Sequence, residues 1–211
     1  SLRSKKTGII GITFSGYNQL IRFKDHYLSN IYCGIGSVLS NYNYKMIFHA
    51  VQPDGSSDQS VELAQQGILE GLIYIVFSAA LDSFYHFIYP HLKSLSIPVV
   101  LIHSSAQKFD LPSVGVDFVN LSYQATKHLL QHGYRSIGLV LPYQQIQLYQ
   151  DIQTGYKQAL VEYSLPLEKE KIIICQGDTF QQGYKAAEKF FASQHSLPRA
   201  LFIISEGLAY G

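Results

Sequence analysis

Short apolar runs alternate along the chain with stretches in which apolar residues recur at helical spacing. Runs such as "GLIYIVF" (residues 71–77) are bounded by polar or Gly-containing segments, so each predicts a buried strand. A further apolar run ends at Asp117 and also predicts a buried strand. The whole pattern predicts strands at 7–14, 44–50, 71–77, 97–103, 136–141, 171–175 and 200–205, and helices at 28–42, 58–69, 83–95, 117–133, 149–163 and 181–192.

Strands that alternate with amphipathic helices predict a parallel sheet covered by helices on both faces, and therefore an α/β fold. Crossovers in such sheets are right-handed, so all strands point the same way and their carboxyl ends meet at one edge, where ligands bind. Several polar or glycine residues follow or end these runs and are expected on that rim: Ser15, Gly16, Ser78, His103 and Asp117.

The alternation begins again after Gly133, and no low-complexity linker separates the two series. Two α/β lobes in series predict a cleft between the lobes as the binding site.

Composition narrows the class of protein. The chain has 211 residues, 47% hydrophobic, and its 16 Lys and Arg against 15 Asp and Glu give a formal charge of +1. These residues lack the basic excess of an independent nucleic-acid binder. Two distant cysteines fit a reducing compartment. No apolar stretch reaches the roughly 20 residues that a bilayer span requires, and the basic N-terminus lacks a cleavage site of the signal-peptide type.

No catalytic constellation is evident. The loop "TFSGYNQ" after the first strand has one glycine, where a phosphate-binding loop needs several. His128 and His132 lie four apart on a predicted helix but lack a third metal ligand. We therefore predict no catalytic residues, no cofactor and no metal site.

Aromatic and acidic side chains are the candidates for ligand contact. The positions of Tyr27 and Tyr149 favour the cleft, where a ring could stack on a sugar or base, although buried aromatics are equally expected in a core. Asp117 has two compatible interpretations, as a ligand contact and as the N-cap of the helix that follows.

Nearly the whole chain resembles the effector-binding core of the lactose/galactose repressor (LacI/GalR) family, which is similar to periplasmic sugar-binding proteins. The resemblance rests on the order and spacing of several segments: "SKKTGIIGITF", "DHYLSNIYCGI", "IPVVLIH", "PSVGVDF", "ATKHLLQHGYRSIGLV", "GYKQAL", "GDTFQQGYKAAEKFF" and "ALFIISEGLAYG".

The resemblance implies a periplasmic binding protein type I-like fold and a cytoplasmic transcriptional regulator. In that family the core binds a small effector between two doubly wound lobes, dimerises, and passes lobe closure to an N-terminal helix-turn-helix domain that holds operator DNA. That domain is expected outside this chain. Residues 1–6 are expected to be a hinge remnant or cloning scar, 7–134 the N-terminal lobe and 135–211 an incomplete C-terminal lobe. Dimer contacts are expected on the helices that start near Leu28 and Asp58.

Three departures from the family pattern concern the predicted site. Ile152 occupies the position, three residues before Gly155, where the family commonly has an effector-binding arginine. Ser205 and Glu206 replace an Asn-Asp pair. The loop after the first strand is longer than usual and contains Arg22 and Lys24, which could supply the lost charge.

The resulting hypothesis is a ligand-sensing core that binds a small polar effector, a sugar or related metabolite, without membrane association. One alternative is an extracytoplasmic sugar-binding protein of a transporter, which shares the fold. Another is a sugar-processing enzyme, for which Asp117 and Asp151 form the pair to test. The predicted ligand-binding residues are Ser15, Tyr27, Ser78, His103, Asp117, Tyr149, Asp151 and Ser205.

Overall fold

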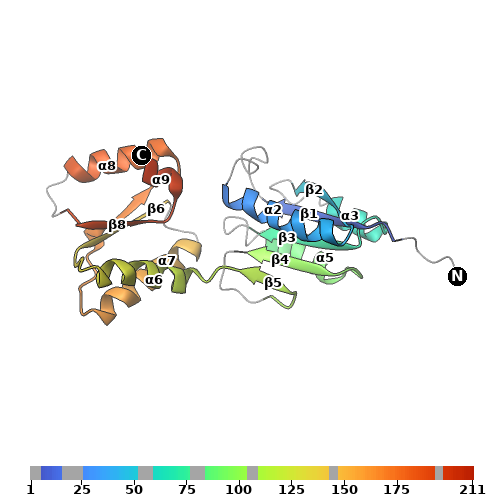
Figure 1. Cartoon of the computed structure of the whole chain (residues 1–211), viewed down its shortest axis with the longest axis horizontal. Helices are drawn as coiled ribbons and strands as arrows, with labels where there is room; N and C mark the ends of the chain where they lie inside the picture. Colours follow the sequence, from blue (N-terminus) through green and yellow to red (C-terminus); the bar gives the residue numbers. More distant parts are fainter. Residues whose placement is uncertain are drawn as a thin grey trace. The chain divides into compact units, whose positions relative to one another are not determined.

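The structure is a computed structural model, and it describes residues 6–15, 26–51, 59–76, 84–103, 109–142, 147–192 and 197–211. The first apolar run of the sequence forms strand β1 (Ile9–Ser15). Internal packing divides the chain into two compact units, residues 1–115 and 116–211 (Figure 1).

The first unit is built on a five-stranded parallel sheet in the order β2-β1-β3-β4-β5. Its other strands are β2 (Lys45–Val51), β3 (Gly71–Val76), β4 (Val99–His103) and β5 (Ser113–Gly115). In this order β1 lies in the interior of the sheet. The chain adds β2 on one side of β1 and then β3, β4 and β5 on the other side. The predicted doubly wound α/β arrangement is therefore confirmed for this unit.

Helices cover both faces of this sheet. On one face α2 (His26–Asn41) packs its Leu28 against Ile12 and Phe14 of β1. The other face is covered by α3 (Gln59–Gln65) and by a π-helical turn, η2 (Phe84–Ile88), that leads into α5 (Tyr89–Lys93). The helix predicted at 83–95 is therefore interrupted. Pro90 lies in the first turn of α5, and because proline has no backbone N–H to donate, a regular α-helix begins afresh there.

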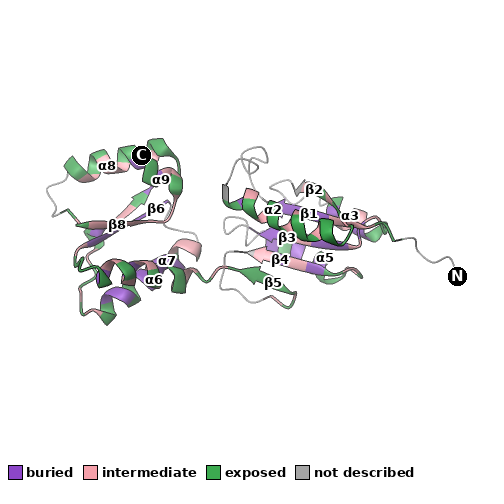
Figure 2. Cartoon of the chain, viewed as in Figure 1, coloured by how far each residue is buried: buried purple, intermediate pink, exposed green. Residues whose placement is uncertain are grey.

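Strand β5 corrects one prediction. The apolar run before Asp117 was expected to form a buried strand, but β5 has three residues, all exposed, and Val114 retains 64% of its accessible surface (Figure 2). Within the described part of the chain β5 pairs with β4 alone, at the edge of the sheet. A short edge strand has a neighbour on one side only, so apolar character does not guarantee burial.

The second unit contains a three-stranded parallel sheet in the order β7-β6-β8. All six residues of the central strand β6 (Ile137–Pro142) are buried (Figure 2), as expected for a parallel strand covered on both faces. Its neighbours are β7 (Ile172–Cys175), preceded by the short helix η3 (Lys169–Lys171), and β8 (Ala200–Ile203).

Within the described residues of this unit, four α-helices flank the sheet. On one face α6 (Phe118–Gln131) and α7 (Gln147–Glu162) enclose a core with β6, while α8 (Phe180–Ala192) and α9 (Glu206–Tyr210) pack on the other. Gly133 ends the α6 segment with a φ of 87°, a left-handed conformation that glycine adopts without steric cost. The predicted end of this helix at Gly133 is thus confirmed.

The boundary between the units differs from the expected one. The sequence predicts it between residues 134 and 135, whereas packing places it after residue 115. The reason is the contact between α6 and α7: Ser122 bonds to the backbone of Ile152, and a methyl group at Gly155 would overlap the carbonyl oxygen of Val119. Helix α6 therefore belongs to the second unit. Among the described helices none combines the length and apolar character of a membrane span.

Candidate ligand-binding site

The carboxyl edge of the first sheet carries two of the predicted residues. Ser15 is the last residue of β1 and His103 the last of β4, and because the strands are parallel both backbones lie at the same edge. Tyr27 lies in the first turn of α2 with 53% of its surface exposed. Ser78 falls outside the described residues, as do Arg22 and Lys24. The ligand roles of these residues remain predictions.

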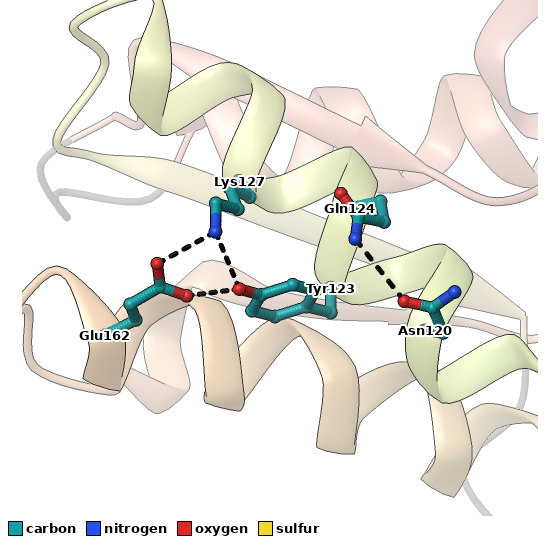
Figure 3. Close-up of polar contacts among 5 residues, drawn as sticks. All are labelled: Asn120, Tyr123, Gln124, Lys127 and Glu162. Atoms are coloured by element: carbon teal, nitrogen blue, oxygen red, sulfur yellow. Dashed lines mark hydrogen bonds and ion pairs between the residues drawn. The ribbon is translucent and has the colours of Figure 1, made fainter.

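The second unit holds the other four predicted residues, and the packing of α6 on α7 decides where two of them lie. Contacts advance in the same direction along both helices: Ser122 bonds to Ile152, and nearer to both C-termini Lys127 pairs with Glu162 (Figure 3). The two helices are therefore parallel, and their N-termini lie at the same end. That end is the carboxyl edge of the sheet, since α7 follows β6 directly.

Asp117 is the N-cap of α6. Its backbone is extended, with φ −77° and ψ 92°, and Oδ1 accepts a hydrogen bond of 2.9 Å from the backbone N–H of Asn120. This satisfies one of the helix N–H groups that have no partner within the helix. The capping interpretation is confirmed. The side chain is also exposed, so the second oxygen can reach a ligand.

Asp151 lies in the second turn of α7 and is buried, with 8% of its surface accessible. Its Oδ1 accepts a 2.9 Å hydrogen bond from Nε2 of Gln147, one turn earlier. Residue 151 precedes Gly155 by one turn, and Gly155 touches Val119 of α6. The next residue, Ile152, accepts the hydrogen bond of Ser122, which also lies in the second turn of its helix. The structure therefore brings Asp117 and Asp151 to the same end of the helix pair.

Ile152 and Tyr149 face the core. Ile152 has no accessible surface and packs in the cluster that contains Leu139 and Leu141 of β6. The position predicted from the family pattern to hold an arginine is thus a core position in this chain, which explains why an apolar residue suits it. Tyr149 is partly buried against the same cluster, so its ring contributes to packing whatever its role toward a ligand.

Ser205 is the N-cap residue of α9, at the carboxyl side of β8, and its Oγ donates a 3.3 Å hydrogen bond to the carbonyl oxygen of Asp178. Glu206 follows, and its Oε1 accepts a hydrogen bond of 2.9 Å from the hydroxyl of Tyr210. This hydrogen bond raises the pKa of Tyr210. Sequence reasoning missed Gln147 and Asp178. The spacing of Gln147 and Asp151, four apart on a helix, is the signal that could have found the first pair.

A polar cluster of Tyr123, Lys127 and Glu162 joins α6 to α7 on the solvent side (Figure 3). Tyr123 donates to Glu162, while Nζ of Lys127 lies 2.8 Å from the Tyr123 hydroxyl and 2.9 Å from Glu162 Oε1. Hydrogen bonds from Tyr123 and then Lys127 lower the pKa of Glu162, and the same contacts raise the pKa of Lys127. The cluster holds the helix pair together.

The rings of His128 and His132 lie 4.3 Å apart, and Nδ1 of His132 is 2.9 Å from the carbonyl oxygen of His128. That contact takes one of the ring nitrogens. Over the part of the chain that the structure covers, no three His, Cys, Asp or Glu side chains gather as a metal site would require.

Comparison with known proteins agrees with this architecture. Residues 18–211 match the family described as periplasmic binding proteins and sugar binding domain of LacI family. Catabolite control protein A of Priestia megaterium is 26% identical over 212 residues, covering 100% of this chain and 60% of that protein. A regulatory protein of the LacI family from Chloroflexus aggregans superimposes with a TM-score of 0.75 at 20% identity, over 97% of this chain and 70% of that one.

A LacI family transcriptional regulator from Enterococcus faecium, solved with bound ribose, superimposes with a TM-score of 0.67 at 20% identity, over 95% of this chain and 68% of the regulator. The fold is that of a periplasmic-binding-protein-like domain. The chain belongs to the family of periplasmic binding proteins and LacI-type sugar-binding domains. It spans 60% of the length of the curated relatives it matches.

Proposed function

We propose that the chain is the ligand-sensing core of a cytoplasmic, LacI-type transcriptional regulator and binds a small, sugar-like effector. The observation that carries the proposal is the family match over residues 18–211. One similar structure is a LacI family transcriptional regulator by its title and another is a regulatory protein of that family, and these names favour regulation over solute transport and over catalysis.

The geometry supports a polar ligand at the carboxyl edges of the sheets, where ligands of open α/β folds bind. In the first unit these edges carry Ser15 and His103, and in the second Asp117, Asp151 and Ser205. Hydroxyl and carboxylate groups of this kind exchange hydrogen bonds with sugar hydroxyls. The proposed ligand-binding set is completed by Tyr27, Ser78 and Tyr149.

Regulation in this proposal uses a helix-turn-helix domain that lies outside the chain and binds operator DNA. Effector binding and DNA binding are then linked: if the effector changes the affinity for DNA by some factor, DNA changes the affinity for effector by the same factor. The coupling can be measured in either direction.

Homodimerisation is part of the proposal, and the surface of α2 supports it. Apart from His26 at its start the helix contains no ionisable side chain except a cysteine and two tyrosines, and its exposed residues include Val38 and Gly34. Among the described residues, a methyl group on Gly34 would meet nothing within 4 Å, so none of their contacts requires glycine there. Glycine inside a helix lowers stability by about 0.5–1 kcal/mol relative to alanine. Close approach of a helix from a second copy would explain why glycine occupies this position. The short helix α3 is the second predicted contact.

A thermal-shift screen of the chain against sugars, sugar acids, polyols and nucleobases tests the binding proposal. A ligand that binds only the folded state raises the melting temperature. The shift should disappear in Asp117→Ala and weaken in Asp117→Ser, which keeps a helix-capping hydroxyl but lacks the carboxylate. If no member of the panel raises the melting temperature, small-molecule sensing of this kind is refuted.

A further inference from the structure

Two polar atoms are buried on neighbouring strands of the first sheet. They are Oγ1 of Thr13 and Nε2 of His49, and neither has a hydrogen-bond partner among the described residues. Thr13 on β1 pairs in register with His49 on β2. Parallel strands lie about 4.8 Å apart, and residues paired in register carry their side chains on the same face of the sheet. The two unpartnered atoms therefore belong to adjacent side chains.

The face that carries them is the one covered by α3 and α5. Gly11 lies two residues before Thr13 and so shares its face of β1. A methyl group on Gly11 would contact the side chains of Leu69 and Leu72, which belong to the core under these helices. Tyr74 of β3 pairs with Thr13 on its other side and is fully buried in the same core. Thr13 itself has no accessible surface.

A buried polar atom that lacks a hydrogen-bond partner carries a free-energy cost, and folded proteins satisfy nearly all such atoms with protein groups or ordered water. Two of them on adjacent side chains indicate a shared partner. Lys45 and Glu62, the charged side chains of β1, β2, β3 and α3, are both exposed, so neither would compensate a buried ion. The partner is therefore neutral. An O–H group both donates and accepts, which suits the Thr13 hydroxyl and either neutral tautomer of His49.

We propose that Thr13 and His49 together bind one neutral O–H group, supplied by an ordered water molecule or by a hydroxyl of the effector. Both residues lie two positions before the last residue of their strand, which is about 7 Å along the strand from the carboxyl edge. The proposed ligand binds at that edge, so a hydroxyl that enters deepest would arrive here. The effector source rests on the proposed function, whereas the water source does not.

A crystal structure of the 211-residue chain tests the site directly. Without ligand, the water source requires an ordered oxygen within hydrogen-bond distance of both Thr13 Oγ1 and His49 Nε2. In crystals soaked with ribose or glucose, the effector source requires a sugar oxygen at that place. A direct hydrogen bond between Thr13 and His49, or no oxygen near them in either crystal, would overturn the proposal.

Thr13→Val separates the two sources in solution, because it replaces the hydroxyl by a methyl group of nearly the same size. If water is bound, the variant loses a hydrogen bond, and the melting temperature of the ligand-free chain should fall by about 2–4 °C. If an effector hydroxyl is bound, that temperature should not fall, but the affinity for ribose or glucose in calorimetry should drop about tenfold.

Thr126→Val is the matched control, since Thr126 Oγ1 is also buried without a partner among the described residues but lies on α6 in the other unit. It should change neither sugar affinity nor lower the melting temperature. A Thr13→Val variant that behaves like this control while a sugar binds would refute the inference and leave the proposed function standing. If no sugar binds, a lowered melting temperature of Thr13→Val means that only the proposed function fails, and an unchanged or raised one means that both fail.

Discussion

The hydroxyl of Ser122 on α6 donates a hydrogen bond of 2.6 Å to the backbone carbonyl of Ile152 on α7, and both side chains are fully buried. This bond joins the two helices near their N-termini, close to the carboxyl edge of the sheet. Because it holds α7 against α6, it also helps to set the position of Asp151 relative to Asp117.

Ser122→Ala should lower the free energy of unfolding by about 1 kcal/mol, since a buried hydrogen bond is lost. Thr126, one turn along α6, is a matched control because its buried Oγ1 has no hydrogen-bond partner among the described residues. Thr126→Val should leave stability unchanged or raise it by up to about 1 kcal/mol. Urea unfolding of both variants checks the pair, and similar losses in the two would contradict the assigned role of Ser122.

Gly155→Ala should destabilise the chain by about 1–3 kcal/mol, because the added methyl meets the backbone carbonyl of Val119, which cannot move without separating α6 from α7. Gly34→Ala places the same change in the interior of α2, in open space. The free energy of unfolding of that variant should rise by about 0.5–1 kcal/mol. Thermal unfolding of the two variants should therefore shift in opposite directions.

Gly34→Ala also tests the proposed dimer. If α2 approaches a second copy closely at Gly34, the methyl should weaken dimerisation while the fold itself becomes more stable. Sedimentation equilibrium at several protein concentrations separates the two effects. A dimer constant equal to that of the unchanged chain would remove α2 from the proposed interface.

The Tyr123, Lys127 and Glu162 cluster should make stability depend on pH. The pKa of Glu162 is lowered in the folded state, mainly by the Tyr123 hydrogen bond, so its contribution is present above the ordinary glutamate value of 4.5 and is lost as pH falls through the folded value. Lys127 has a raised pKa, so its contribution persists below 10.5 and disappears as pH rises through its folded value. Glu162→Gln should flatten the acidic limb of the stability profile measured by denaturant unfolding.

The two cysteines should differ in reactivity. Cys33 is exposed on α2, whereas Cys175 at the end of β7 is buried, and burial raises the pKa of its thiol. The thiolate is the reactive form, so Cys33 should react with a thiol reagent first and Cys175 only as its unit opens. Cys33→Ser should remove the fast phase, and a fast phase that survives in this variant would place Cys175 at the surface.

Much of the candidate site could be placed in outline from sequence. Polar residues at the ends of apolar runs predict the carboxyl edge, and Ser15, His103 and Ser205 do lie at strand ends or just beyond. Sequence could not show that Ile152 is a core residue or that Asp151 is buried beside it. Adjacent helical positions point about 100° apart, so which of them faces the core depends on how α7 is rotated against its neighbours.

Periodicity by itself determined the order and type of the elements and the parallel α/β class, because the repeat of apolar positions differs between strand and helix whatever the surroundings. Tertiary structure decided the rest. Packing assigned α6 to the second unit, left β5 exposed at an edge, and set Asp151 at the same end of the helix pair as Asp117. These outcomes depend on contacts between segments that are distant in sequence. A local pattern of apolar residues does not specify which segment will cover them, so it cannot predict these contacts.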